Sequence, residues 1–137
     1  MTTWEWIHLA KREFSGSLSE WSRRAGVGRS TLTRVLASPN PNPRAGTFLK
    51  ILHGAGIEVY SGEFLLVGLD EALVVLERAR LSSRVTIAEL AKRTGEREQR
   101  LERIFRGRAT PLTWELMDLF MLLRCPLRRQ PSSTRRP

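Results

Sequence analysis

The chain has 137 residues, a length that suits one ordinary domain or two very small ones. Its 23 Lys and Arg against 14 Asp and Glu give a net charge of +9, which favours nucleic acid or else an acidic partner. Hydrophobic residues make up 41%, enough for a packed core, and no apolar run approaches the roughly 20 residues of a membrane helix. A single cysteine excludes an intramolecular disulfide. Because the start does not read as a signal peptide, we expect a cytoplasmic protein that binds no membrane.

Two stretches of the chain resemble each other in register. Residues 17–26, SLSEWSRRAG, align with residues 86–95, TIAELAKRTG, at an offset of 69. The alignment continues without a gap as far as Leu36 with Phe105, and it resumes at an offset of 68 where Pro43 meets Pro111. Because glycine, glutamate, arginine and the apolar spacing agree in one register, the sequence predicts two tandem repeats.

Each repeat is predicted to contain four short helices. Three helix starts carry the capping-box pattern, a hydroxyl residue three positions before a glutamate: Thr2 with Glu5, Ser17 with Glu20, and Thr86 with Glu89. The second helix of each repeat is predicted to end at Gly26 or Gly95, where glycine allows a left-handed turn. The proline-rich residues 38–43 are predicted to form a stiff loop before the fourth helix.

The segment between the repeats is predicted to be a β-hairpin. Two β-favouring runs in residues 57–67 flank Ser61-Gly62, and this is the only strand structure that we expect. The hairpin would either pack the two repeats together or pair with another chain. Residues 69–80 are predicted to form the first helix of the second repeat. Residues 128–137 lack an apolar anchor and are predicted to be a disordered basic tail.

The second and third helices of the first repeat, residues 17–36, resemble the helix-turn-helix of the Cro and phage-repressor-like (XRE) transcription regulators. The matching positions are Trp21, Ser22, Ala25, Gly26, Val27, Leu32 and Val35, with Ala91, Gly95, Leu101 and Ile104 in the second repeat. Residues 47–57 resemble that family's next helix. The second repeat departs from the family at Glu96, where an apolar residue is usual, and at Arg124-Cys125. Because of Glu96, we expect the second repeat to be the less stable one.

The resemblance implies an all-α fold with two tandem lambda-repressor-like helix-turn-helix domains, residues 1–57 and 69–127, and a short β-hairpin at 58–68 between them. It implies a sequence-specific regulator of transcription, from a bacterium or its phage or mobile DNA, that binds double-stranded DNA. Two copies in one chain would act as a pseudo-dimer. It implies no cofactor.

The third helix of each repeat would present one face to DNA bases. In the first repeat this face contains short polar residues and arginines: Gly28, Arg29, Ser30, Thr31, Thr33 and Arg34. In the second repeat it mixes acids and bases: Arg97, Glu98, Gln99, Glu102, Arg103 and Arg106. Because of that mixture, the second face suits a protein partner as well as it suits DNA.

The rims of the two units are expected to supply phosphate contacts. The candidates lie near helix starts: Ser17, Ser19, Arg44, Thr47 and Lys50 in the first repeat, and Arg108 and Thr110 in the second. For any one of them, ordinary capping or solvation is an equal alternative. Four arginines of the tail would add salt-sensitive, non-specific affinity: Arg128, Arg129, Arg135 and Arg136.

The remaining features predict neither catalysis nor a metal site. His8 and His53 are far apart in sequence without other ligands, and no nucleophile–base motif is present. The four tryptophans, Trp4, Trp6, Trp21 and Trp114, are expected in the core. The alternative function is an interaction protein, such as an antitoxin, an anti-activator or an RNA polymerase-binding factor, in which the second repeat binds RNA polymerase or another regulator. The sequence is also compatible with a homodimer.

Overall fold

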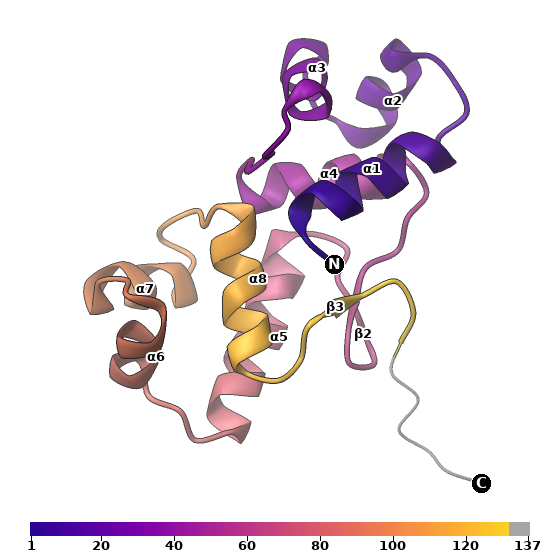
Figure 1. Ribbon diagram of the computed structural model, residues 1–137. Coiled ribbons are helices and arrows are strands. Elements are labelled where there is room, and N and C mark those ends of the chain that lie inside the picture. The colour runs from indigo at the N-terminus through magenta and orange to yellow at the C-terminus, as the bar shows by residue number, and fades with distance from the viewer. Residues whose placement is uncertain (132–137) are drawn as a thin grey trace, which may run out of the picture.

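The computed structural model describes residues 1–131 as a mainly helical protein with a small three-stranded sheet (Figure 1). The helices of the first repeat are α1 (Thr3–Glu13), α2 (Leu18–Ala25), α3 (Arg29–Ala37) and α4 (Ala45–Gly54). Those of the second repeat are α5 (Leu69–Ser82), α6 (Ile87–Thr94), α7 (Glu98–Phe105) and α8 (Thr113–Leu122). The strands are β1 (Tyr60–Ser61), β2 (Phe64–Leu65) and β3 (Leu127–Arg128).

The local signals in the sequence act as expected at the helix ends. Capping boxes open α1, α2 and α6 at Thr2, Ser17 and Thr86. Gly26 and Gly95 end α2 and α6 with φ of 69° and 77°, in the left-handed region where a side chain is strained. The four helices of one repeat therefore have direct counterparts in the other, with α1 matching α5 and α4 matching α8.

The two repeats meet at the starts of α4 and α8. The Ala45 N–H donates to the Pro111 carbonyl at 2.9 Å, and the Thr113 N–H donates to the Pro43 carbonyl at 2.9 Å. Ala45 corresponds to Thr113, and Pro43 to Pro111, so exchanging the repeats exchanges the two bonds. Reciprocal contacts of this kind define a local two-fold axis. In Figure 1, α2 and α3 lie at one end of the molecule and α6 and α7 at the other, with α4 and α8 between them.

Side chains strengthen this junction. The Thr113 hydroxyl also donates to the Pro43 carbonyl at 2.6 Å, and the Trp114 N–H donates to the Asn42 side chain at 3.2 Å. The buried apolar residues of both repeats form one continuous cluster, including Phe48 and Phe120 with no exposed surface. The repeats thus share a core and are not separate bodies on a flexible linker.

The expectation that the hairpin is the only strand structure is wrong. β1 pairs with β2 as predicted, but β3 pairs with the other side of β1, with Tyr60 opposite both Leu65 and Arg128. The start of the disordered tail, predicted at residue 128, is therefore placed too early in the chain. Buried Leu127 anchors the chain, Arg128 joins the sheet, and Arg129 bonds to Glu13 at 3.1 Å. Residues 132–137 of the predicted tail, Arg135 and Arg136 included, lie outside the described residues.

Two of the four tryptophans are not in the core. Trp6 and Trp21 are buried, whereas Trp4 and Trp114 are about half exposed, at 47% and 54%. The inward face of α8 is already occupied by Leu116, Leu119 and Phe120, which turns Trp114 outward. No helix within residues 1–131 is long and apolar enough to cross a membrane.

Candidate nucleic-acid interface

The turn between α2 and α3 is closed by one side chain. The Ser22 hydroxyl donates to the Val27 carbonyl, one residue beyond the left-handed Gly26. The Gly26 and Val27 N–H groups both donate back to the Ser22 carbonyl, at 3.0 and 3.2 Å. Gly54 of α4 packs so closely on Ala25 that an added Cβ would lie 2.7 Å from the Ala25 Cβ. The turn is therefore held from both sides, which fixes the direction in which α3 leaves it.

The α3 helix has an apolar inner face and a polar outer face. Leu32 and Val35 are buried inside, and five of the six predicted base-reading residues of this repeat are exposed: Gly28, Arg29, Ser30, Thr33 and Arg34. The sixth, Thr31, is only partly exposed. The Thr33 hydroxyl bonds to the Arg29 carbonyl at 2.9 Å, so it is engaged within the helix and leaves its methyl group to the outside.

Charge on this face is positive and uncompensated. Arg29 and Arg34 line one shallow groove with Ser30 and Thr33. Within residues 1–131, no acidic side chain forms an ion pair with either arginine. Gly28 caps α3 without a side-chain bond, so the first N–H groups of the helix also point at this surface without a capping side chain. The arrangement suits an anion with hydrogen-bond acceptors.

The outer face of α7 differs from that of α3. All six predicted residues are exposed, but Glu102 pairs with Arg106 at 3.6 Å between side chains that are 48% and 62% exposed. Glu98 lies in the first turn of the helix, where a carboxylate favours the helix end and repels phosphate. Arg97, Gln99 and Arg103 line a groove together with Arg100.

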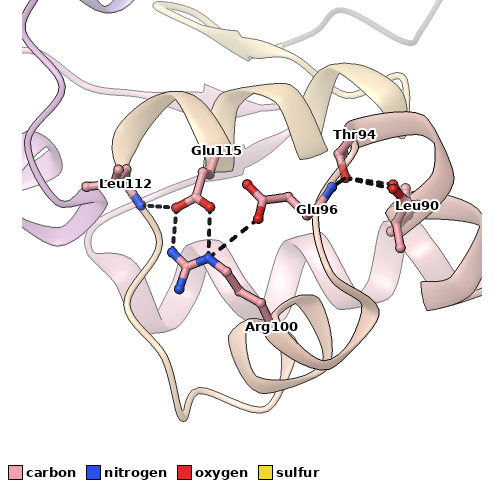
Figure 2. Close-up of polar contacts among 7 residues, drawn as sticks. Leu90, Thr94, Glu96, Arg100, Leu112 and Glu115 are labelled. Carbon is pink, nitrogen blue, oxygen red and sulfur yellow. Dashed lines mark hydrogen bonds and ion pairs between the residues drawn. The ribbon is translucent and has the colours of Figure 1, made fainter.

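Arg100, which was not among the predicted site residues, ties α7 to α8 (Figure 2). Its guanidinium donates two bonds to Glu115, at 3.0 and 2.7 Å, and lies 3.7 Å from Glu96. Glu115 also accepts the Leu112 N–H at 2.8 Å. The bonds from Arg100 and Leu112 lower the pKa of Glu115 to about 2, against the effect of its burial. A hydrogen bond to Glu115, partial burial and the Glu115 charge raise the pKa of Glu96, and the Arg100 charge opposes them.

The same cluster explains how Glu96 is tolerated at a position where the first repeat has the apolar Val27. The Glu96 N–H donates to the Thr94 hydroxyl at 3.1 Å, and that hydroxyl donates to the Leu90 carbonyl at 2.8 Å (Figure 2). The carboxylate faces Arg100 and is not left unpaired. The sequence signal for this cluster was the simultaneous change from three neutral to three charged residues at equivalent positions: Val27, Thr31 and Thr47 become Glu96, Arg100 and Glu115.

The predicted phosphate contacts lie in two settings. At the start of α2, the Ser17 hydroxyl accepts the Glu20 N–H at 3.1 Å while the Glu20 carboxylate accepts the Ser17 N–H at 3.0 Å. These bonds lower the pKa of Glu20, so this helix start already carries an anion, while Ser19 is exposed beside it. Of the other candidates, Arg44, Arg108 and Thr110 precede α4 or α8, whereas Thr47 and Lys50 lie within α4.

Arg44 has the most distinctive of these positions. It is exposed and forms an isolated antiparallel bridge with Leu112, its counterpart in the second repeat. Because Leu112 is the equivalent of Arg44, this bridge places Arg44 next to the local two-fold axis that the junction defines. Thr47 is partly buried on α4, whereas Lys50, Arg108 and Thr110 are exposed.

Neither histidine lies in a metal-binding group. His8 stacks on Trp4 with ring centroids 4.7 Å apart, and His53 lies on α4. Within residues 1–131, no three His, Cys, Asp or Glu side chains are arranged to hold a metal ion. Comparison of the chain with known proteins finds no matching family model, no matching curated protein and no matching solved structure. A functional proposal therefore depends on the sequence resemblance and on the geometry.

Proposed function

We propose that the chain is a sequence-specific regulator of transcription that binds double-stranded DNA through two helix-turn-helix units, α2–α3 and α6–α7. The observation that carries the proposal is the reciprocal bonding of Ala45 with Pro111 and of Thr113 with Pro43. Together with the equivalence of the two repeats, it supports an arrangement in which a local two-fold axis relates the outer faces of α3 and α7 inside one chain. Homodimeric DNA-binding proteins use the same symmetry between two chains, because the DNA backbone has two-fold axes of its own.

The shared core makes the spacing of the two units part of the fold. In two-fold helix-turn-helix proteins the reading helices lie about 34 Å apart and meet half-sites about 10 bp apart. We expect the same of α3 and α7. The two outer faces share an arginine at one equivalent position, Arg34 and Arg103, and differ at the others, so the half-sites of this chain are expected to be unlike in sequence. Arg44, beside the axis, is assigned to the DNA backbone between the half-sites.

The α3 helix is assigned the larger share of base recognition. Arg29 and Arg34 are exposed and unpaired within the described residues, and an arginine fork matches the O6 and N7 acceptors of guanine. Ser30 and the Thr33 methyl group suit smaller contacts with base edges. The α7 helix offers Gln99 for adenine and Arg103 for guanine, but Glu98 and Glu102 on the same face weaken its attraction to phosphate.

A second function is supported by that acidic component of α7. Exposed Glu102 and Arg106 pair across one helical turn, and Glu98 precedes them on the same face. A mixed-charge face of this kind suits a protein with a complementary pattern, such as RNA polymerase or another regulator. In this case α3 alone would read DNA and α7 would recruit the partner.

Selection of bound fragments from a random double-stranded DNA library, at near-physiological salt, tests both functions. Two unlike half-sites one helical turn apart are expected if α3 and α7 both read DNA. One half-site, or inverted copies of one half-site, would assign DNA reading to a single helix and protein binding to α7. No enrichment over the starting library would contradict DNA recognition altogether.

A further inference from the structure

Apart from Leu112, the exposed large apolar side chains within residues 1–131 form two groups. One group lies around the start of α1 and the outer face of α8, where Met1, Trp4, Trp114 and Met121 line one cavity. The other group lies on β2, the segment after it and the outer face of α5: Phe64, Leu65, Val67, Val74 and Leu81, which are 40% to 60% exposed. We call the second group the β2–α5 patch.

The β2–α5 patch includes an open sheet edge. The strand order is β2-β1-β3, so β1 is covered on both sides and β2 on one side only. The Leu66 N–H donates to the Val59 carbonyl at 2.8 Å, and alternation along an antiparallel ladder then directs the Leu65 N–H and C=O away from β1. An apolar edge of this kind is a template for another strand.

The helical half of the patch is continuous with that edge. Arg78 of α5 lies over the Phe64 ring, 6.0 Å from its centroid, and so connects strand and helix. Val74 and Leu81 flank Arg78 on α5 and line one groove with Phe105. Because Val74 and Leu81 are spaced by seven residues within α5, they lie along one side of the helix.

The first repeat shows that the fold does not require apolar residues here. At an offset of 69, Val74 corresponds to Glu5 of α1 and Leu81 to Arg12, and both counterparts are exposed and charged. The same helix therefore packs in the first repeat with charged residues at these two positions. Apolar residues at these positions of α5 but not of α1 indicate a contact that only the second repeat makes.

Charge and symmetry indicate what that contact is. The groove beside Val74 and Leu81 is lined by Asp70 and Glu77 together with Arg78 and Arg106, so it carries both signs in balance. A strongly anionic partner such as DNA gains little from such a surface, whereas a surface that carries both signs complements itself across a two-fold axis. In Figure 1, α1 and α4 separate β2 from α3, so this surface leaves α3 accessible.

We propose that the β2–α5 patch binds a second copy of the chain, with β2 paired to β2 of the copy in antiparallel fashion and the two α5 helices packed beside the joined sheet. The pairing is isologous: Leu65 meets its own copy, and Arg78 faces the acidic side chains of the other α5. Such a dimer carries four reading helices, two in each chain, and bridges two operators.

Sedimentation velocity of the full chain, from micromolar to hundreds of micromolar without DNA, tests the proposal. The mass is expected to rise from 15.7 kDa towards twice that value as concentration rises. The double variant Val74→Glu with Leu81→Arg, which installs the first-repeat residues, is expected to remain monomeric throughout. Because no DNA is present, the result does not depend on whether the chain binds DNA.

A matched control separates the patch from general hydrophobicity. Met121→Glu changes an equally exposed side chain of the other apolar group, at 62%, and is expected to leave dimerisation unchanged. Leu65→Lys, at the strand edge, is expected to weaken the dimer without replacing any residue of α5. Circular dichroism verifies that each variant is folded. A wild type that stays monomeric at every concentration, or a dimer that persists in both patch variants, would overturn the proposal.

Discussion

One corner of the fold is filled with different chemistry in the two repeats. It lies where the turn, the third helix and the fourth helix meet, and its residues are Val27, Thr31 and Thr47 in the first repeat and Glu96, Arg100 and Glu115 in the second. In the first repeat this corner is neutral, and both arginines of α3 are exposed and form no ion pair within residues 1–131. In the second repeat, Arg100 holds α7 to α8 by donating two hydrogen bonds to Glu115. Glu115 also accepts the N–H of Leu112, a residue of the junction between the repeats.

The comparison shows that one backbone geometry accommodates two different sets of surface residues. The local geometry is preserved even where the residues change, because Arg124 takes a left-handed φ of 61° where its counterpart Gly56 has 79°. The surface is not preserved, since α3 is purely basic and α7 carries two acids. We therefore expect the first repeat to dominate DNA recognition and the second to position the first on the DNA.

Removing the arginines of α3 is expected to have the largest effect. The double variant Arg29→Ala with Arg34→Ala should lower affinity for the selected operator by about 30-fold or more, since each bidentate arginine–guanine pair contributes about 1–3 kcal/mol. The matched variant on the other helix, Arg97→Ala with Arg103→Ala, should cost less. Fluorescence anisotropy with the operator and with a scrambled duplex measures both. Unchanged discrimination between the duplexes in the α3 variant would remove α3 from the reading role.

The charged corner of the second repeat is expected to contribute to stability and little to DNA affinity. Arg100→Thr leaves Glu96 and Glu115 without their partner and should lower the free energy of unfolding by about 1–2 kcal/mol, a value reduced for the solvent exposure of the Arg100 side chain. Urea denaturation followed by circular dichroism measures this.

The control for this variant installs the whole corner of the first repeat. The triple variant Glu96→Val, Arg100→Thr, Glu115→Thr should recover most of the lost stability, because exchanging a complete ionic cluster for neutral packing is often close to neutral. A triple variant less stable than Arg100→Thr alone would show that the two corners are not interchangeable. A large loss of DNA affinity in Arg100→Thr would indicate that Arg100 also contacts DNA.

Local signals predicted the helical part of the fold because each depends on a few neighbouring residues. The hydroxyl and glutamate at Ser17 and Glu20 and the left-handed position at Gly26 need no knowledge of distant chain segments. The outer face of α3 followed from the spacing of Leu32 and Val35 for the same reason.

Long-range pairing was missed because it depends on which segments meet in space. A segment of two residues, Leu127 and Arg128, is too short to carry a strand pattern in the sequence. It becomes a strand only because it pairs with the open side of β1. Trp114 looked like a core residue by analogy with an apolar helix face, but its counterpart is Gly46, which packs beneath Leu69. The difference between Gly46 and Trp114 at equivalent positions was the sign in the sequence that the surfaces of α4 and α8 differ.

The pH dependence of stability gives the finest comparison of the two corners. Glu115 has a pKa of about 2 in the folded chain against an ordinary value of 4.5. Its contribution is therefore complete above about pH 4.5 and is lost as the pH falls towards 2. Glu96 acts in the opposite sense. Its raised pKa favours the folded state at pH values below the ordinary pKa of a glutamate, and this effect is smaller than that of Glu115. The corner of the first repeat, with Thr47 in place of Glu115, has no such dependence.

Glu115→Gln removes this contribution together with the effect of the Glu115 carboxylate on the pKa of Glu96, while the carboxylates outside this corner keep their surroundings. The variant should be less stable than the wild type by about 1–2 kcal/mol at pH 7, a value reduced for the solvent exposure of Arg100, and the difference should shrink as the pH falls to 3. Urea denaturation at both pH values measures it. A difference that stays constant from pH 7 to 3 would mean that the ionised Glu115 carboxylate does not stabilise the fold. A difference that shrinks would show that the second repeat is held to the junction by charge where the first is held by packing.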